Sequence, residues 1–213
     1  MKGTTHLAIG CAIGAVACAY YPFSLNHAAW YLSVAGFSAL SADLDGPSLL
    51  SGKITKLSKV LRNVVLGSGI VLMVGLACLY LMFDRFYTGY ASCAIAAFLL
   101  GLVAKQGFIR NGLVSLVGCV LLYYGLASGQ TWMIGLALFI IGAPWLKHRG
   151  MTHTVWALAL WGAIGRELER QLGIEGIAAV AVAGYASHLL ADTMTPSGVK
   201  WLYPLYKKSI KLH

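Results

Sequence analysis

The sequence predicts an all-α fold: a polytopic transmembrane helical bundle of about eight helices, with both termini cytoplasmic. Hydrophobic residues occupy 59% of the 213 positions and charged residues only 11%, and the mean hydropathy is +0.75. Because soluble domains carry about 25% charged residues, a water-soluble fold is excluded. The apolar residues form runs long enough to cross a hydrocarbon core of about 30 Å as helices, unlike the short alternating segments of barrel strands.

Apolar runs and the turn-forming residues between them define the elements in chain order. The expected helices cover residues near 4–21, 28–42, 63–83, 91–104, 111–127, 131–146, 154–171 and 174–191. Turn formers separate them, among them Pro22 after the first run, Gly89 after the third, Gly129 after the fifth and Gly173 before the last. With no internal repeat or low-complexity tract, residues 1–213 are expected to form a single integral membrane domain.

The basic residues orient this bundle. Threading eight helices back and forth places the N-terminus, residues 43–62, 105–110 and 147–153, and the tail from residue 192 on one side. That side holds 13 of the 16 Lys and Arg residues. The exceptions are Arg85, Arg166 and Arg170. By the positive-inside rule the basic side is cytoplasmic, so the protein is expected in a cytoplasmic membrane with both termini inside.

Residues 46–62 form a basic connection on that side. Leu50, Ile54, Leu57 and Leu61 recur at helical spacings, while lysines take the other faces. This pattern indicates an amphipathic helix on the inner membrane surface; a solvated loop whose lysines serve only topology is the alternative. Membrane lipids, including anionic inner-leaflet lipids, are the expected partners of the +9 net charge, and no stable nucleic-acid partner is expected. The sequence sets no oligomeric state.

The five cysteines are expected to be small core residues of the helices. All lie in apolar runs, and no C-x-x-C spacing occurs. They are therefore predicted to form neither disulfides nor a metal site.

Seven acidic and histidine residues gather on the cytoplasmic side of the threaded chain. They are His6, Asp43, Asp45, His148, His153, His188 and Asp192. The remaining acids all fall on the other side. Because ionisable groups near membrane depth are costly to bury unpaired, such segregation indicates a functional cluster.

Three local motifs supply most of this cluster. His188 and Asp192 are four residues apart on an apolar helix, so they share one face and can hold one cation; a plain His–Asp hydrogen bond between helices is the alternative. Asp43 and Asp45 offer two carboxylates at a helix end that Gly46-Pro47 terminates.

The third motif runs from Lys147 to His153. In an unbroken helix its two histidines would point about 140° apart, so both can face one site only if Gly150 bends the segment. Arg149 lies between them and suits a phosphate or another anion, because its planar fork matches oxygens bidentately. The alternative is a positive-inside anchor with bystander histidines.

Imidazoles with carboxylates are the ligands of zinc and, with more oxygen donors, of manganese or iron. Seven ligands exceed the need of one tetrahedral ion, so the expected cofactor is a divalent metal, zinc first, in one to three ions. Such a cluster generates a hydroxide nucleophile and neutralises an in-line attack on phosphorus.

These motifs together resemble the YdjM family of bacterial inner-membrane proteins, described as membrane-bound, metal-dependent hydrolases. The matching segments are Gly3-Thr4-Thr5-His6-Leu7, Asp43-Leu44-Asp45-Gly46-Pro47, His148 to Thr154, Gly184 to Asp192, Thr195-Pro196-Ser197-Gly198 and Tyr203-Pro204. The resemblance implies that the seven residues named above are the metal ligands and that the protein lies in the bacterial inner membrane. A more distant likeness to the zinc phospholipase C and P1 nuclease group implies phosphoester hydrolysis.

Two features depart from the family pattern. Relatives often carry His directly after D-x-D, where this chain has Gly46, which puts the number of metals in doubt. Their second and third motifs are also closer together, whereas about 100 residues with extra helices intervene here.

The sequence thus predicts a membrane-bound metal-dependent hydrolase that cleaves a phosphoester of a lipid or another membrane-associated substrate. Arg149 is the expected phosphate clamp, with His148 as catalytic residue or ligand and His6 as ligand or proton shuttle. The rivals are a divalent-metal or proton transporter and a non-catalytic membrane protein with a structural metal site. Transporter sites lie near the bilayer midplane and often come with repeats, whereas these residues cluster at helix ends.

Overall fold

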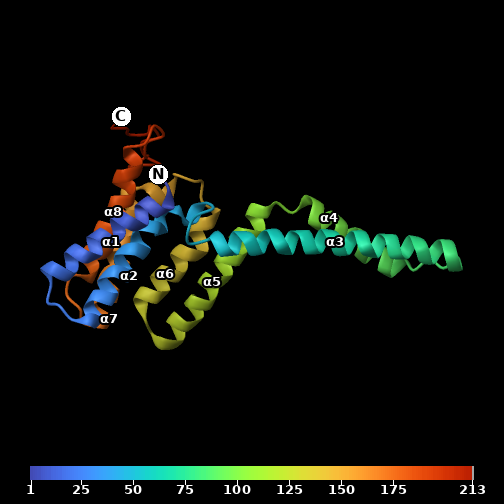
Figure 1. The fold of residues 1–213 in the computed structure, drawn as a ribbon, viewed down its shortest axis with the longest axis horizontal. Helices are drawn as coiled ribbons and strands as arrows, with labels where there is room; N and C mark the ends of the chain where they lie inside the picture. Colours follow the sequence, from blue (N-terminus) through green and yellow to red (C-terminus); the bar gives the residue numbers. More distant parts are fainter. Residues whose placement is uncertain (213) are drawn as a thin grey trace. The chain divides into compact units, whose positions relative to one another are not determined.

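The computed structural model describes residues 1–212 and confirms the all-α fold class (Figure 1). Eight α-helices are present: α1 (Gly3–Tyr20), α2 (Leu25–Ser41), α3 (Gly52–Phe83), α4 (Thr88–Val103), α5 (Gln106–Ser128), α6 (Thr131–Gly142), α7 (Val155–Leu172) and α8 (Ile177–Thr193). Three short 3-10 helices follow α2 and α6 and precede α7: η1 (Ala42–Asp45), η2 (Ala143–Trp145) and η3 (Met151–His153). Within residues 1–212 no β-strand forms, and Val199 and Ile210 make an isolated bridge.

The chain divides into two compact units. The first comprises residues 1–51 and the described residues from 114 on; the second is Gly52–Leu113. In the first unit α1 packs on α2, α8 packs on α1, α2 and α7, and α6 packs on α7. A buried cluster that includes Tyr31, Ala35 and Ile177 forms part of its core.

Close packing of α8 against α2 depends on a glycine. A side chain at Gly184 would meet the carbonyl oxygen of Ala35 at 2.7 Å and Ser38 at 2.9 Å. The absence of a side chain lets the two backbones approach, as small residues do in membrane helix pairs. Four residues further on, the same approach brings His188 to the end of α2.

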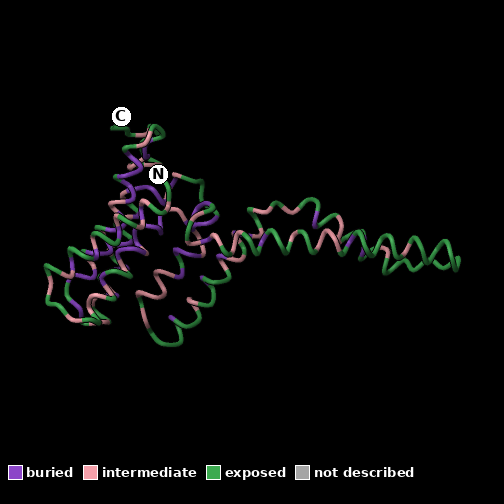
Figure 2. Tube along the Cα trace, viewed as in Figure 1, coloured by how far each residue is buried: buried purple, intermediate pink, exposed green. Residues whose placement is uncertain are grey.

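The second unit is a pair of packed helices, α3 and α4, with the first turns of α5. Gly69 lies against the backbone of Phe98, and Gly101 against that of Leu66. Within α3 only Ser58 and Gly69 are buried, and exposed residues dominate the unit (Figure 2). Most of these exposed side chains on α3 and α4 are apolar, as lipid contact requires.

Among residues 1–212, three helices are long and apolar enough to cross a membrane: α1, α3 and α5. The apolar helices α4, α8 and the stretch Thr131–Trp145 are shorter. Helix α7 is the amphipathic one, with charged residues such as Arg166 and Glu169 in its second half. That the chain crosses the membrane eight times and that both termini are cytoplasmic stay predictions.

The main differences from the expected boundaries lie in α3, α5 and α6. Helix α5 begins at Gln106, so most of the expected connection 105–110 is helical. Residues 52–62 are not separate from the next helix: α3 runs unbroken through them to Phe83. Their contact with the membrane surface stays a prediction, as does the single integral domain. Helix α6 ends at Gly142, because Pro144 lies in the 3-10 turn that follows.

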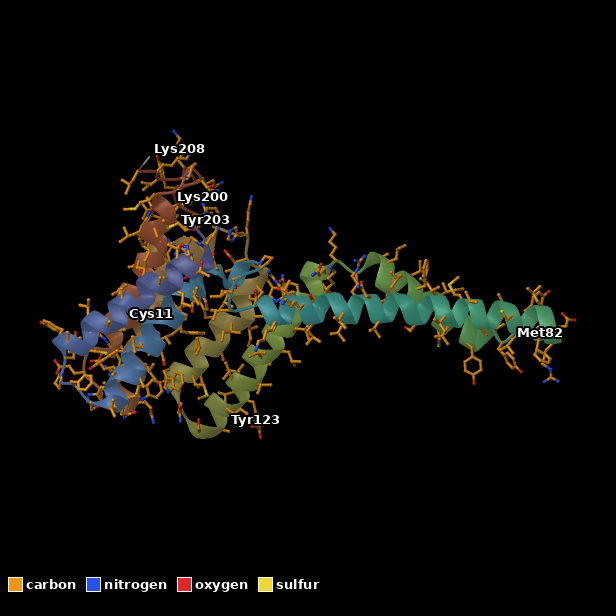
Figure 3. The ribbon with its side chains drawn as sticks, in the orientation of Figure 1. Cys11, Met82, Tyr123, Lys200, Tyr203 and Lys208 are labelled. Carbon is orange, nitrogen blue, oxygen red and sulfur yellow. The ribbon has the colours of Figure 1, made fainter. Side chains whose placement is uncertain are left out.

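The prediction that the cysteines are core residues is wrong; among the described residues all five are free thiols. Four are exposed, including Cys11 on α1 (Figure 3), and Cys18 is half-buried. Because these helices are apolar on all sides, the sequence pattern does not distinguish lipid-facing from buried positions.

Candidate metal centre

The structure brings all seven candidate residues together at one end of the first unit. His6 comes from the second turn of α1, Asp43 and Asp45 from η1, and His188 and Asp192 from the last turns of α8. His148 and His153 come from the connection between α6 and α7. Segments far apart in the sequence thus supply one cluster.

The connection before α7 turns sharply, as the spacing of its histidines requires. Arg149 has a φ of 56°, in the left-handed region, and Gly150 has φ −97° and ψ −124°. A side chain at Gly150 would lie 2.6 Å from the carbonyl oxygen of Lys147, so only glycine fits. The bend leaves the ring centroids of His148 and His153 5.7 Å apart.

Four residues form what we call the inner group: Asp43, His153, His188 and Asp192. Each offers one ligand atom, and these atoms all lie within 4.8 Å of one another. The Asp43 carboxylate lies 3.6 Å from His153 Nε2 and 3.5 Å from His188 Nε2. Asp192 lies 3.7 Å and 3.9 Å from the same two atoms. Both imidazoles are fully buried.

The tautomer of His188 is set by a backbone carbonyl. Nδ1 lies 2.7 Å from the oxygen of Ala39, which can only accept, so Nδ1 carries the hydrogen. In the neutral ring Nε2 then holds a lone pair, and this buried atom has no hydrogen-bond partner. A lone pair facing carboxylates calls for a cation, and such a carbonyl–His arrangement is typical of metal ligands.

Thr152 plays the matching part for His153, and the sequence interpretation missed it. Its hydroxyl donates to Asp45 Oδ2 at 2.7 Å and lies 2.9 Å from His153 Nδ1. Since that hydroxyl hydrogen is used by Asp45, Nδ1 donates to Thr152. In the neutral ring Nε2 then holds a lone pair, and this buried atom has no hydrogen-bond partner. The position of Thr152, between the two histidines of one motif, was the available signal.

His6 extends the inner group from α1. It is 1% exposed, and its ring stacks on that of His188 with centroids 3.8 Å apart. Its Nε2 lies 3.5 Å from Asp192 Oδ1, and neither ring nitrogen has a hydrogen-bond partner. The amino group of Met1 lies 2.8 Å from the same carboxylate oxygen.

Asp43, Asp45 and His148 form what we call the outer group, which shares Asp43 with the inner group. His148 Nδ1 hydrogen-bonds to Asp45 Oδ1 at 2.7 Å. The His148 side chain is 56% exposed, whereas that of Asp45 is fully buried. Within the outer group, His148 therefore lies at the surface of the cluster and Asp45 in its interior.

Without a metal ion the cluster balances its charge with protons. Burial opposes ionisation of Asp43 and Asp45, but the neighbouring imidazoles prevail, lowering the pKa of Asp45 to about 2 and that of Asp43 further. Burial likewise lowers the pKa of His153, but the nearby carboxylates of Asp43 and Asp45 outweigh it and raise the pKa to about 9. The hydrogen bond to Asp45 raises the pKa of His148.

Arg149 closes one side of the cluster. Its Nη2 lies 3.1 Å from Asp192 Oδ2, and its Nη1 donates to the Thr195 hydroxyl and the Gly198 carbonyl, each at 3.3 Å. A cavity of about 390 Å³ opens above the carboxylates, and its lining includes Arg149 and His148. In the segment after α8, the Lys200 ammonium lies 5.9 Å from the Tyr203 ring centroid (Figure 3).

These residues fit a divalent cation. Three buried imidazoles present unpartnered nitrogens to two carboxylates, a donor set suited to zinc and related ions. An all-α chain with membrane-spanning helices and a buried Asp–His cluster that could bind a metal ion is an integral membrane protein with a candidate metal centre.

The particular family follows from comparison with known proteins. The sequence model of the YdjM inner membrane protein family matches residues 1–213, the whole chain, so the chain belongs to this family and is an inner-membrane protein. No curated protein and no solved structure matches the chain significantly.

Proposed function

We propose that this protein is a metal-dependent hydrolase of the inner membrane that cleaves a phosphoester. The observation that carries the proposal is the set of three buried Nε2 atoms, of His6, His153 and His188, without a hydrogen-bond partner. Two of them face the carboxylates of Asp43 and Asp192, and His6 faces Asp192 alone. Buried polar atoms are rarely left unpaired unless a ligand completes them.

Zinc is the proposed ion, with manganese or iron as alternatives. The inner group would hold the first ion and the outer group a second, with Asp43 shared between them. A bound divalent ion supplies Lewis acidity and activates water for attack on phosphorus near neutral pH.

The protein's own residues would orient the substrate. Arg149 lines the cavity next to Asp192, where its guanidinium can take a phosphate oxygen. Its contacts with Thr195 and Gly198 fix its direction before substrate binds. His148 lines the same cavity with a half-exposed ring, so it can exchange a proton with the leaving group and with solvent.

The position of the cluster favours an enzyme over a transporter. His6 lies near the start of α1, and Asp192 near the end of α8. The remaining members lie in the connections or in the last turns of α8, at the same end of the bundle. Transporter sites lie near the bilayer midplane in broken helices.

The test is metal-dependent phosphate release by detergent-purified protein. Chelator-stripped protein is reloaded with zinc, manganese or iron and offered para-nitrophenyl phosphate and phosphatidic acid. We expect turnover by the wild type and by His27→Ala, a histidine at the far end of α2 outside the cluster. His188→Ala should lose both metal and turnover.

Arg149→Lys separates binding from chemistry. It should keep its metal but lose turnover by about 100-fold or more, because one ammonium cannot replace the bidentate fork. Metal-loaded wild type that releases no more phosphate than His188→Ala from any of these substrates would contradict the hydrolase proposal.

A further inference from the structure

A second cavity, separate from the metal centre, lies within the first unit among α2, α6, α7 and α8. Its volume is about 300 Å³, at the lower end of the range of small-ligand sites. The lining is almost wholly apolar and rich in aromatic rings. It includes Trp30, Phe37, Trp132, Leu136, Trp161 and Ile164.

The indole N–H groups of Trp132 and Trp161 in this lining already have hydrogen-bond partners. Trp161 Nε1 donates to the Ser38 hydroxyl at 2.9 Å, and Trp132 Nε1 donates to Gln130 Oε1 at 3.0 Å. A polar ligand would find few partners there and would lose its hydration. A hydrocarbon chain gains from the same burial at about 25 cal/mol per Å².

The cavity runs along the helices that lead to the metal centre. With a rise of 1.5 Å per residue, Ser38 on α2 lies about 8 Å from Asp43, and Ala181 on α8 lies about 10 Å from His188. Both line the cavity. From Ser38 back to Trp30, the cavity extends about 12 Å further along α2. Measured along α2 and along α8, the end of the cavity nearest the metal centre thus lies at a similar distance from the cluster.

The near wall also contacts the cluster through the backbone. Ser38 is followed by Ala39, whose carbonyl accepts the hydrogen bond from His188 Nδ1. At the rim, Ser33 is exposed and Trp30 and Trp132 are half-buried, so the cavity opens on the side of the bundle. For a bundle in a membrane, that side faces lipid.

From this arrangement we propose that the cavity binds one hydrocarbon chain of a lipid phosphoester whose headgroup lies at the metal centre. The inference rests on the proposed function and narrows its substrate class to lipids. A polar head 8 to 10 Å above a buried chain is the geometry of a lipid that enters sideways from the bilayer. The chain would position the phosphate beside Arg149, so its binding energy would contribute to orientation.

The test measures chain binding directly. Phosphatidic acid with brominated chains is titrated into delipidated protein in detergent, and quenching of tryptophan fluorescence is followed, with the unbrominated lipid as blank. We expect saturable quenching in the wild type. Ser33→Phe fills the mouth of the cavity from an exposed position and should weaken binding about tenfold, as the loss of room for a methylene or two does.

Two variants serve as controls. Ser92→Phe makes the same change at an exposed serine of α4 and should leave binding unchanged. Leu136→Phe narrows the cavity from α6 and should repeat the effect of Ser33→Phe. Unchanged metal content in all three variants would show that they fold.

The outcomes separate the two proposals. Wild type without saturable quenching, or Ser33→Phe and Leu136→Phe equal to Ser92→Phe, would overturn the chain site even if para-nitrophenyl phosphate were hydrolysed. Weakened binding in the two cavity variants would uphold the chain site even if no substrate were hydrolysed.

Discussion

The inner and outer groups share Asp43 but differ in what satisfies their nitrogen atoms. In the inner group the Nε2 atoms of His153 and His188 are buried without a hydrogen-bond partner. In the outer group His148 Nδ1 already has a 2.7 Å bond to Asp45, and its ring is 56% exposed.

The difference indicates unequal roles. A buried lone pair costs stability unless a cation completes it, whereas an exposed, hydrogen-bonded imidazole costs nothing without one. We therefore expect the inner group to hold an ion tightly and the outer group to hold one weakly, exchanging with solvent.

The largest effect is expected at the shared carboxylate. Asp43→Ala removes a ligand from both groups, so the protein should lose its tight ion and any weak one. Metal content by mass spectrometry after gel filtration would measure this. Asp84→Ala, at an acid outside the cluster in the α3–α4 connection, is the matched control. An Asp43→Ala variant with full metal content would show that Asp43 is not a ligand shared by the two groups.

His188→Ala and His148→Ala separate the two groups. Loss of His188 should abolish tight binding, because the inner group loses the Nε2 atom of this ring. The Ala39 carbonyl sets the tautomer that leaves a lone pair on that atom. Loss of His148 should leave the tight ion and remove only the weak one. Zinc titration with a competing chelator would resolve the two affinities. Equal loss of the tight ion in both variants would contradict the assignment of tight binding to the inner group alone.

Thr152 supports the inner group without being a ligand in it. Thr152→Val keeps the shape but removes hydrogen bonds to Asp45 and His153, and should weaken tight binding about 10- to 100-fold. Thr152→Ser keeps the hydroxyl and should restore it. A Thr152→Val variant with wild-type affinity would show that the hydroxyl does not orient these ligands.

Counted per pH unit, the effect of pH is the smallest. With its pKa raised to about 9, His153 carries a proton at neutral pH when no metal is bound. An ion must displace that proton, so apparent affinity should rise about tenfold per pH unit from pH 6 and level off near pH 9. A competition titration at several pH values would measure the slope, and a flat profile would contradict it.

Much of the fold could be predicted, because apolar runs mark membrane helices. All eight helices lie where the runs place them. The division into two units could not be predicted. When a helix is apolar on all sides, its sequence does not show which face packs against another helix. Nor could the unbroken start of α3, because Lys53 to Arg62 suits an interfacial helix and a continuous one alike.

For the site, the sequence predicted which residue types gather at one end of the bundle. Contacts between distant segments could not be predicted from the sequence. Examples are the stacking of His6 on His188 and the hydrogen bond from His188 to the Ala39 carbonyl. The bend at Gly150 was predicted, because two histidines five residues apart cannot share a site in a straight helix.

The central claim is that the inner group binds a divalent ion through imidazole nitrogens. X-ray absorption at the zinc edge of zinc-loaded protein tests it most directly. We expect nitrogen or oxygen ligands at about 2.0–2.1 Å with at least two imidazoles, fewer in His188→Ala than in His148→Ala. Zinc surrounded only by oxygen, or the same spectrum in wild type and His188→Ala, would contradict it.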